Sequence, residues 1–304
     1  MTRLGDWCLQ PNITWRAAIV AATAAGIARI TTTPAMTMPR GPQRIACLTA
    51  ETVDLLYRLG VEDRIVGVSG FTRFPPEARQ RPFVSAFTTI HYDVIESLRP
   101  DLIIGFSDLQ ADAMRELARR GYQVLLTNQR TLSEAFETML LIGRVVDRAN
   151  QAEQLVASLQ ATLDAARGKR STRAVHPRVY FEEWNEPMIS GLTWVSELIE
   201  AAGGDDIFAD LAARPTAPQR IVDPRTVVER TPDIIIASWC GKPVRFDAIR
   251  ARPGWGAIPA ILADELHEVK SCYCLQPGPS LITEGLPRFS AIVDRWYDRR
   301  IGDD

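Results

Sequence analysis

Aromatic residues recur directly after the apolar segments that we predict to be strands. Phe71, Phe106, Trp184 and Trp239 each follow such a segment closely. Ligands of parallel α/β sheets bind beyond the carboxyl ends of the strands, and aromatic rings there can hold a large, flat or apolar ligand by burial and stacking. The alternative is packing in the hydrophobic core, where most Phe side chains lie. Four aromatic residues at similar positions favour the binding role.

Residues that could carry out a reaction form no known catalytic arrangement. The acidic pairs Glu182-Glu183 and Asp205-Asp206 consist of chain neighbours, and neighbours on a strand point to opposite faces. The sequence contains no GxSxG, GxxxxGK[ST] or GxGxxG motif. We therefore expect a protein that is not an enzyme and that carries no cofactor.

Metal-binding residues are few and scattered. His91, His176 and His267 form no HxxxH or HExxH spacing. The five cysteines are an odd number, which argues against a fully paired disulfide framework. Cys272-x-Cys274 could ligate a soft metal, but a single pair is a weak signal. We expect structural thiols and no metal site.

Alternating strands and helices would position the aromatic residues. From Arg44 onward, short apolar segments alternate with amphipathic ones, as in a parallel α/β sheet. In the first half, the expected strands are 45–48, 65–68, 102–106 and 124–126, and the expected helices are 51–59, 94–98 and 111–120.

Two sequence blocks occur in the same order in both halves of the chain. Residues 52–60 (TVDLLYRLG) are similar to 196–203 (SELIEAAG), and residues 94–104 (VIESLRPDLII) to 226–236 (TVVERTPDIII). We infer an α/β fold of two related lobes, each with a mainly parallel sheet and flanking helices. The cleft between two such lobes is the natural ligand site.

The segment between the halves is predicted to be one long connecting helix. It lacks proline, and its apolar residues recur at helical spacing. About 35 helical residues would extend about 50 Å, which exceeds the radius of one lobe. The predicted organisation is an N-terminal lobe (44–130), a connecting helix (131–168) and a C-terminal lobe (169–304).

Residues 1–43 are interpreted as a signal-like leader and a linker. Ala17–Ala28 is too short to span a bilayer, which needs about 20 residues, but it fits the apolar region of a secretory signal. Residues 30–43 are rich in Thr and Pro, as in a linker. We expect export to the periplasm. Asp6 and Arg29 are atypical of a signal, so a cytoplasmic location is the alternative.

The composition is that of a globular chain with balanced charge. The 304 residues are 46% hydrophobic, and the formal net charge is −2. This composition excludes a disordered chain, and no basic surplus points to nucleic acid. Of the 35 cationic residues, 32 are arginines. Either genomic base composition explains this excess, or some arginines bind an anionic ligand.

Several motifs together resemble the periplasmic substrate-binding proteins of ABC importers that take up vitamin B12 and iron–siderophores. The matching segments are 66–76 (VGVSGFTRFPP), 83–87 (FVSAF), 93–106, 197–204, 238–242 (SWCGK), 252–255 (RPGW) and 275–279 (LQPGP). The last three are similar to a subgroup usually labelled cobalamin-binding. The resemblance covers residues 44–297. It implies a class III periplasmic-binding-protein fold that captures a corrinoid, such as cobalamin or cobinamide, and delivers it to an importer permease. We expect a monomer.

The resemblance also implies site residues. In the first lobe, the aromatic residues that would contact the corrin are Phe71, Phe87 and Phe106. Phe stands here where the B12-binding relatives have Tyr or Trp. The second-lobe contacts do not align, so location alone suggests Trp184, Trp239, Tyr273 and Gln276.

One acidic residue per lobe docks such proteins on the permease. The first-lobe position corresponds to Asp93, whereas the second-lobe position is occupied by Arg225, a reversed charge. Glu229 lies one turn further along the same helical face and could substitute. The alternative is that both acidic residues are ordinary solvated charges.

Two other functions remain open from the sequence. The same scaffold could bind a ferric siderophore or haem. An anionic chelate would require cationic side chains in the cleft, and Arg220 and Arg245 are the candidates to inspect. A cytoplasmic corrinoid-handling or enzymatic protein is the second alternative, favoured if the leader is not cleaved.

Overall fold

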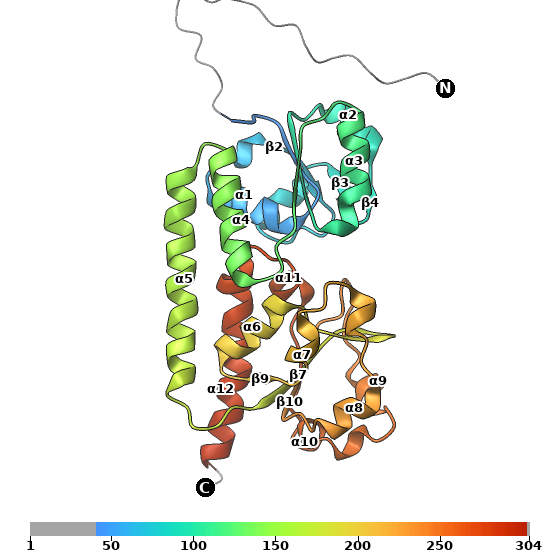
Figure 1. Ribbon diagram of the computed structural model, residues 1–304, viewed down its shortest axis with the longest axis vertical. Coiled ribbons are helices and arrows are strands. Elements are labelled where there is room, and N and C mark those ends of the chain that lie inside the picture. The colour runs from blue at the N-terminus through green and yellow to red at the C-terminus, as the bar shows by residue number, and fades with distance from the viewer. Residues whose placement is uncertain (1–40, 303–304) are drawn as a thin grey trace, which may run out of the picture. The chain divides into compact units, whose positions relative to one another are not determined.

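The computed structural model describes residues 41–302, which include both predicted lobes (Figure 1). The predicted leader lies outside the described residues, apart from the last residues of the linker. Both lobes have an α/β fold, and the predicted fold class is confirmed.

The N-terminal lobe contains a six-stranded sheet in the order β4-β3-β2-β1-β5-β6. All neighbouring strands are parallel except β3 and β4. The strands are β1 (Ile45–Cys47), β2 (Ile65–Ser69), β3 (Phe83–Ala86), β4 (Thr89–Ile90), β5 (Leu102–Phe106) and β6 (Val124–Thr127). The helices are α1 (Ala50–Arg58), α2 (Tyr92–Leu98) and α3 (Ala111–Arg119).

The C-terminal lobe contains a five-stranded sheet in the order β11-β10-β7-β8, with β9 paired to β7. Only the β7–β8 pair is antiparallel. The strands are β7 (Arg178–Asn185), β8 (Met188–Ser190), β9 (Asp205–Asp206), β10 (Ile234–Ala237) and β11 (Leu266–Glu268). The helices are α6 (Thr193–Ala202), α7 (Ala209–Ala212), α8 (Pro224–Glu229), α9 (Phe246–Arg250), α10 (Pro259–Leu262) and α11 (Ser271–Cys274).

The repeated sequence blocks form the same local structure in both lobes. The Asp101 carboxylate accepts a hydrogen bond from the backbone N–H of Arg44 (2.9 Å), and Asp233 does the same for Arg178 (2.8 Å). Both arginines also donate to carbonyl oxygens at the C-terminal end of the helix before the Pro-Asp pair. In each lobe, these hydrogen bonds connect the start of the first strand to the adjacent helix and strand.

The predicted connecting helix over 131–168 is two helices, α4 (Leu132–Val145) and α5 (Ala149–Ser171). The break is a Schellman-type C-terminus in which Asp147 has a positive φ of 57° and Arg148 N–H donates to the Gly143 carbonyl (2.7 Å). Asp147 occupies the position where Gly is usually found, so no glycine in the sequence marked the end of α4.

The two helices pack side by side (Figure 1). A Cβ atom on Gly143 would lie only 2.3 Å from the Cβ of Ala152, so this close approach requires glycine. The 23-residue α5 is the long connecting helix between the lobes, extending about 35 Å.

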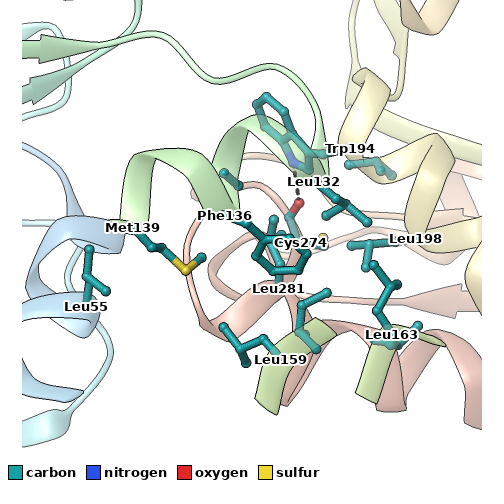
Figure 2. Packing of buried hydrophobic residues seen from close by; sticks show 14 of the residues in the cluster. Leu55, Leu132, Phe136, Met139, Leu159, Leu163, Trp194, Leu198, Cys274 and Leu281 are labelled. Atoms are coloured by element: carbon teal, nitrogen blue, oxygen red, sulfur yellow. Dashed lines mark hydrogen bonds between the residues drawn. The ribbon is translucent and has the colours of Figure 1, made fainter. Parts of the chain in front are cut away.

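A shared hydrophobic cluster joins α4 and α5 to both lobes (Figure 2). Met139 of α4 lies beside Leu55 of α1, and Phe136 of α4 lies in the same cluster as Leu159 of α5 and Leu198 of α6. The final helix, α12 (Leu286–Gly302), packs against α6. Because apolar burial is the main favourable term in folding, this cluster stabilises the arrangement that forms the cleft.

Candidate ligand-binding cleft

Residues of both lobes line a cleft with a volume of about 470 Å³. Several of its lining segments follow strands: the start of α1 after β1, the loops after β2 and β3, the end of β5, and the loop after β10. Residues 215–218 and Arg220, after α7, and residues 275–277, after α11, also line it. The carboxyl ends of the strands are the expected side of parallel sheets for a ligand, and the volume lies within the usual range for small-molecule sites.

The three aromatic residues predicted from the first lobe come together in this cleft. Phe71, Phe87 and Phe106 all line it, and so does Gln276 from the second lobe. Phe71 is 41% exposed although it is a large apolar side chain. Phe87 has a positive φ of 59°, and its carbonyl accepts a hydrogen bond from Gln110 (2.6 Å). The N-terminal lobe thus presents several rings to a ligand.

The two tryptophans predicted from the second lobe do not line the cleft. β7 extends to Asn185 and pairs with β8, so Trp184 lies within a hairpin and not after a strand. Lys242 packs on the Trp184 ring, with Nζ 3.7 Å from its centre. Trp239 is buried, and its Nε1–H donates to Glu182 (2.9 Å). Both rings serve the packing of the lobe.

Tyr273 also lies outside the cleft lining. Its ring contacts that of Phe74 at 5.5 Å between centres, and the guanidinium of Arg288 lies 3.8 Å from its centre. Of the two residues predicted from the 273–276 loop, Gln276 lines the cleft and Tyr273 does not.

Trp194 is a cleft residue that sequence reasoning missed. It is the second residue of α6, lines the cleft and packs edge-on against Phe106, with ring centres 6.3 Å apart. Its Nε1–H donates to the Cys274 carbonyl (3.0 Å), which fixes the ring. The sequence feature that could have identified Trp194 as a cleft residue was its position at the start of the repeated helix.

Two arginines line the cleft, and each has a carboxylate partner. Arg220 is buried and pairs with Glu183 (2.6 Å); Arg130 pairs with Asp108. Burial raises the pKa of Glu183, and Arg220 opposes that rise. Arg245, the other inspected cation, is exposed at the start of α9 and does not line the cleft. The lining therefore has no surplus of positive charge.

Glu51 is a further acidic residue of the lining, at the start of α1. The Thr49 hydroxyl donates to its carboxyl group. Burial raises the pKa of Glu51 to about 7, and the Thr49 hydrogen bond opposes that rise. This group therefore titrates in the neutral range.

The thiols near the cleft differ in exposure. Cys240 is exposed and lines the cleft, whereas Cys274 is buried, and that burial raises its pKa to about 12. Within residues 41–302, no group of three or more His, Cys, Asp or Glu side chains is placed to hold a metal ion.

The proposed docking residues lie on helices of opposite lobes. Asp93 is exposed in the first turn of α2. Arg225 and Glu229 are exposed at the two ends of α8. In the part of the chain that the structure describes, no helix combines the length and apolar character needed to cross a membrane.

Two related α/β lobes around an aromatic-lined cleft define a binding protein of the two-lobed class. Residues 45–271 match the sequence profile of the periplasmic binding protein family, and the chain belongs to this family. Its members serve as substrate-binding proteins of ABC importers, and the predicted resemblance is confirmed at this level.

Similar proteins differ in what they bind. The ABC transporter substrate-binding lipoprotein YvrC of Bacillus subtilis is 25% identical over 267 residues, covering 85% of this chain and 82% of that protein. A cobalamin-binding protein of Halobacterium salinarum is 27% identical over 206 residues, covering 66% of this chain and 55% of that protein. The periplasmic haem-binding protein RhuT of Roseiflexus has the same fold, with a TM-score of 0.72 at 22% identity, covering 85% and 99%.

Proposed function

We propose that this protein captures a corrinoid, such as cobalamin or cobinamide, in the cleft and delivers it to an ABC importer permease. The observation that carries the proposal is the set of rings on the cleft walls. Phe71, Phe87 and Phe106 stand on one side, and Trp194 borders them from the other lobe. Such rings bind a large ligand by burial and by contact with its faces and edges.

The charges of the lining support a corrinoid over an anionic chelate. Arg130 and Arg220 face the cleft, which favours haem or a ferric siderophore as the second candidate. Each guanidinium, however, is held by a carboxylate. An anionic ligand would have to displace that carboxylate or approach its negative charge. A corrinoid, with peripheral amides, meets no such obstacle.

Calorimetric titration with cyanocobalamin, cobinamide and haem tests the proposal. We expect corrinoid binding with a Kd in the nanomolar to micromolar range. Phe71→Ala should weaken it about tenfold through loss of ring contact. Trp184→Ala is the matched control, because Trp184 lies outside the lining, and its Kd should stay unchanged. Haem binding without any corrinoid response at about 100 µM would overturn the proposal in favour of the second candidate.

We also propose export to the periplasm, binding without chemistry or a resident cofactor, and a monomeric state. Mass spectrometry of the mature N-terminus from the native host checks the first of these. An N-terminus cleaved after the apolar segment supports export, and an intact leader on cytoplasmic protein supports the intracellular alternative.

A further inference from the structure

Glu51 stands apart from the other charged residues of the cleft because no cationic side chain among residues 41–302 forms an ion pair with it. It is 6% exposed and lines the cleft. Within the described residues its carboxyl group is held by the Thr49 hydroxyl and its own backbone N–H. Burying a carboxyl group without a counter-charge is costly, and this cost is not repaid by an ion pair.

The opposite lobe closes directly over Glu51. A Cβ atom on Gly278 would lie 2.6 Å from the Cβ of Glu51. The preceding residues, Gln276 and Pro277, line the cleft beside it. The carboxyl group therefore lies where the two lobes meet, and a ligand held between the lobes passes close to it.

We propose that Glu51 is a specificity-determining residue whose carboxylate accepts hydrogen bonds from donor groups of the ligand and disfavours ligand carboxylates. Primary amides at the edge of a flat macrocycle are the donors that fit. This inference deepens the proposed function and rests on it. A carboxylate accepts charge-assisted hydrogen bonds, which are stronger than neutral ones.

The charged and titratable groups around Glu51 leave it free for this role. On α1, Asp54 pairs with Arg58 (2.8 Å). The charge of Glu51 acts on the Cys47 thiol of β1, as does that of Arg81. The other charged residues that line the cleft are paired with each other, Asp108 with Arg130 and Glu183 with Arg220. The 276–279 loop contributes no charge. Burial raises the pKa of Glu51 to about 7, and no neighbouring charge contributes to this rise.

The role predicts a particular dependence of affinity on pH. Below pH 7 the free protein holds Glu51 protonated, so a ligand that binds the carboxylate must first displace the proton. Affinity should therefore rise with pH and level off above the pKa of the free protein. Between pH 6 and pH 8 the expected gain is about tenfold, since each pH unit below the pKa costs about tenfold in the ionised fraction.

The test is a calorimetric Kd for cyanocobalamin at pH 6, 7 and 8. Glu51→Gln keeps the shape of the side chain and should remove the pH dependence. Thr49→Val removes the hydroxyl that lowers the pKa of Glu51, so the midpoint of the profile should move to higher pH. Glu153→Gln, an exposed carboxyl group on α5, is the matched control and should reproduce the wild-type profile.

The outcomes separate the inference from the function it rests on. A flat wild-type profile, or the same dependence in Glu51→Gln, overturns the role of Glu51 while corrinoid binding stands. Absence of corrinoid binding at every pH overturns both. Haem carries carboxylates, so Glu51→Gln should bind it more tightly than wild type at pH 8; unchanged haem affinity contradicts the predicted exclusion.

Discussion

The two lobes share one backbone scaffold but place different side chains at equivalent positions. Leu48 and Glu182 each lie four residues after the arginine that opens the first strand of the lobe, and both are fully buried. Leu48 packs in an apolar cluster. Glu182 accepts hydrogen bonds from Arg252 (2.6 and 2.9 Å), Trp239 (2.9 Å) and Tyr180 (3.1 Å).

The difference shows what a buried charge demands of its surroundings. An apolar residue needs only close packing, whereas the fully buried carboxylate of Glu182 is stabilised by hydrogen-bond donors and a counter-charge. In the C-terminal lobe those partners include Trp239, an aromatic residue close to the end of a strand. The ring is thereby committed to the core of its lobe and is absent from the cleft lining.

The largest predicted effect comes from breaking the Glu182–Arg252 ion pair, which has no counterpart at Leu48 of the N-terminal lobe. Arg252→Leu leaves Glu182 buried without its counter-charge and should lower the free energy of unfolding by about 3–5 kcal/mol. Urea denaturation measures this. The matched control is Arg250→Leu, which breaks the exposed pair with Asp264 and should cost less than about 1 kcal/mol.

Making the C-terminal lobe resemble the N-terminal one sharpens the comparison. The double variant Glu182→Leu with Arg252→Leu removes both charges, so most of the lost stability should return. A double variant no more stable than Arg252→Leu alone would show that the partners of Glu182 matter for packing and not for charge.

The scaffold could be predicted from the sequence because it is repeated. The Arg-strand and Pro-Asp blocks make the same backbone hydrogen bonds in both lobes, so similar sequence meant similar structure. Of the first-lobe rings that line the cleft, Phe71 and Phe106 were predicted from their positions at the ends of strands of a regular parallel sheet, and Phe87 was predicted from the resemblance.

The second-lobe site could not be predicted because its side chains depend on contacts that are distant in sequence. Trp184 is displaced by the β7–β8 hairpin, and Trp239 is recruited by Glu182. Trp194 reaches the cleft from the start of α6, which follows β8, a short strand antiparallel to β7 that was not predicted from the sequence. The break between α4 and α5 was missed because Asp147 adopts a conformation typical of glycine.

Glu51 and Trp194 are each the second residue of the repeated helix, and only the former titrates. The folded-state pKa of Glu51 is raised from 4.5 to about 7, so the folded protein binds the proton more tightly than the unfolded chain. Stability should therefore fall by about 3 kcal/mol as pH rises from about 4.5 to above 7.

Glu51→Gln tests this linkage, since Gln does not ionise. The variant should match wild type near pH 5 and exceed it at pH 8, with urea denaturation at both pH values as the measurement. If the difference in the free energy of unfolding between variant and wild type is the same at both pH values, Glu51 is not an unpaired, buried carboxyl group.

The smallest effects are expected at the exposed docking helices, where the lobes differ in charge. α2 presents Asp93, whereas α8 presents Arg225 before Glu229. We propose that Asp93 contributes more to permease binding, because Arg225 offsets the charge of Glu229. Exposed ion pairs contribute up to about 1 kcal/mol, so Asp93→Arg should weaken binding to the permease about fivefold and Glu229→Arg about twofold.

Kd measurements with the reconstituted permease at low and high salt check this, because screening should reduce both effects. Equal losses from the two variants would show that the lobes dock symmetrically despite Arg225, and no loss from Asp93→Arg would remove the docking role of α2.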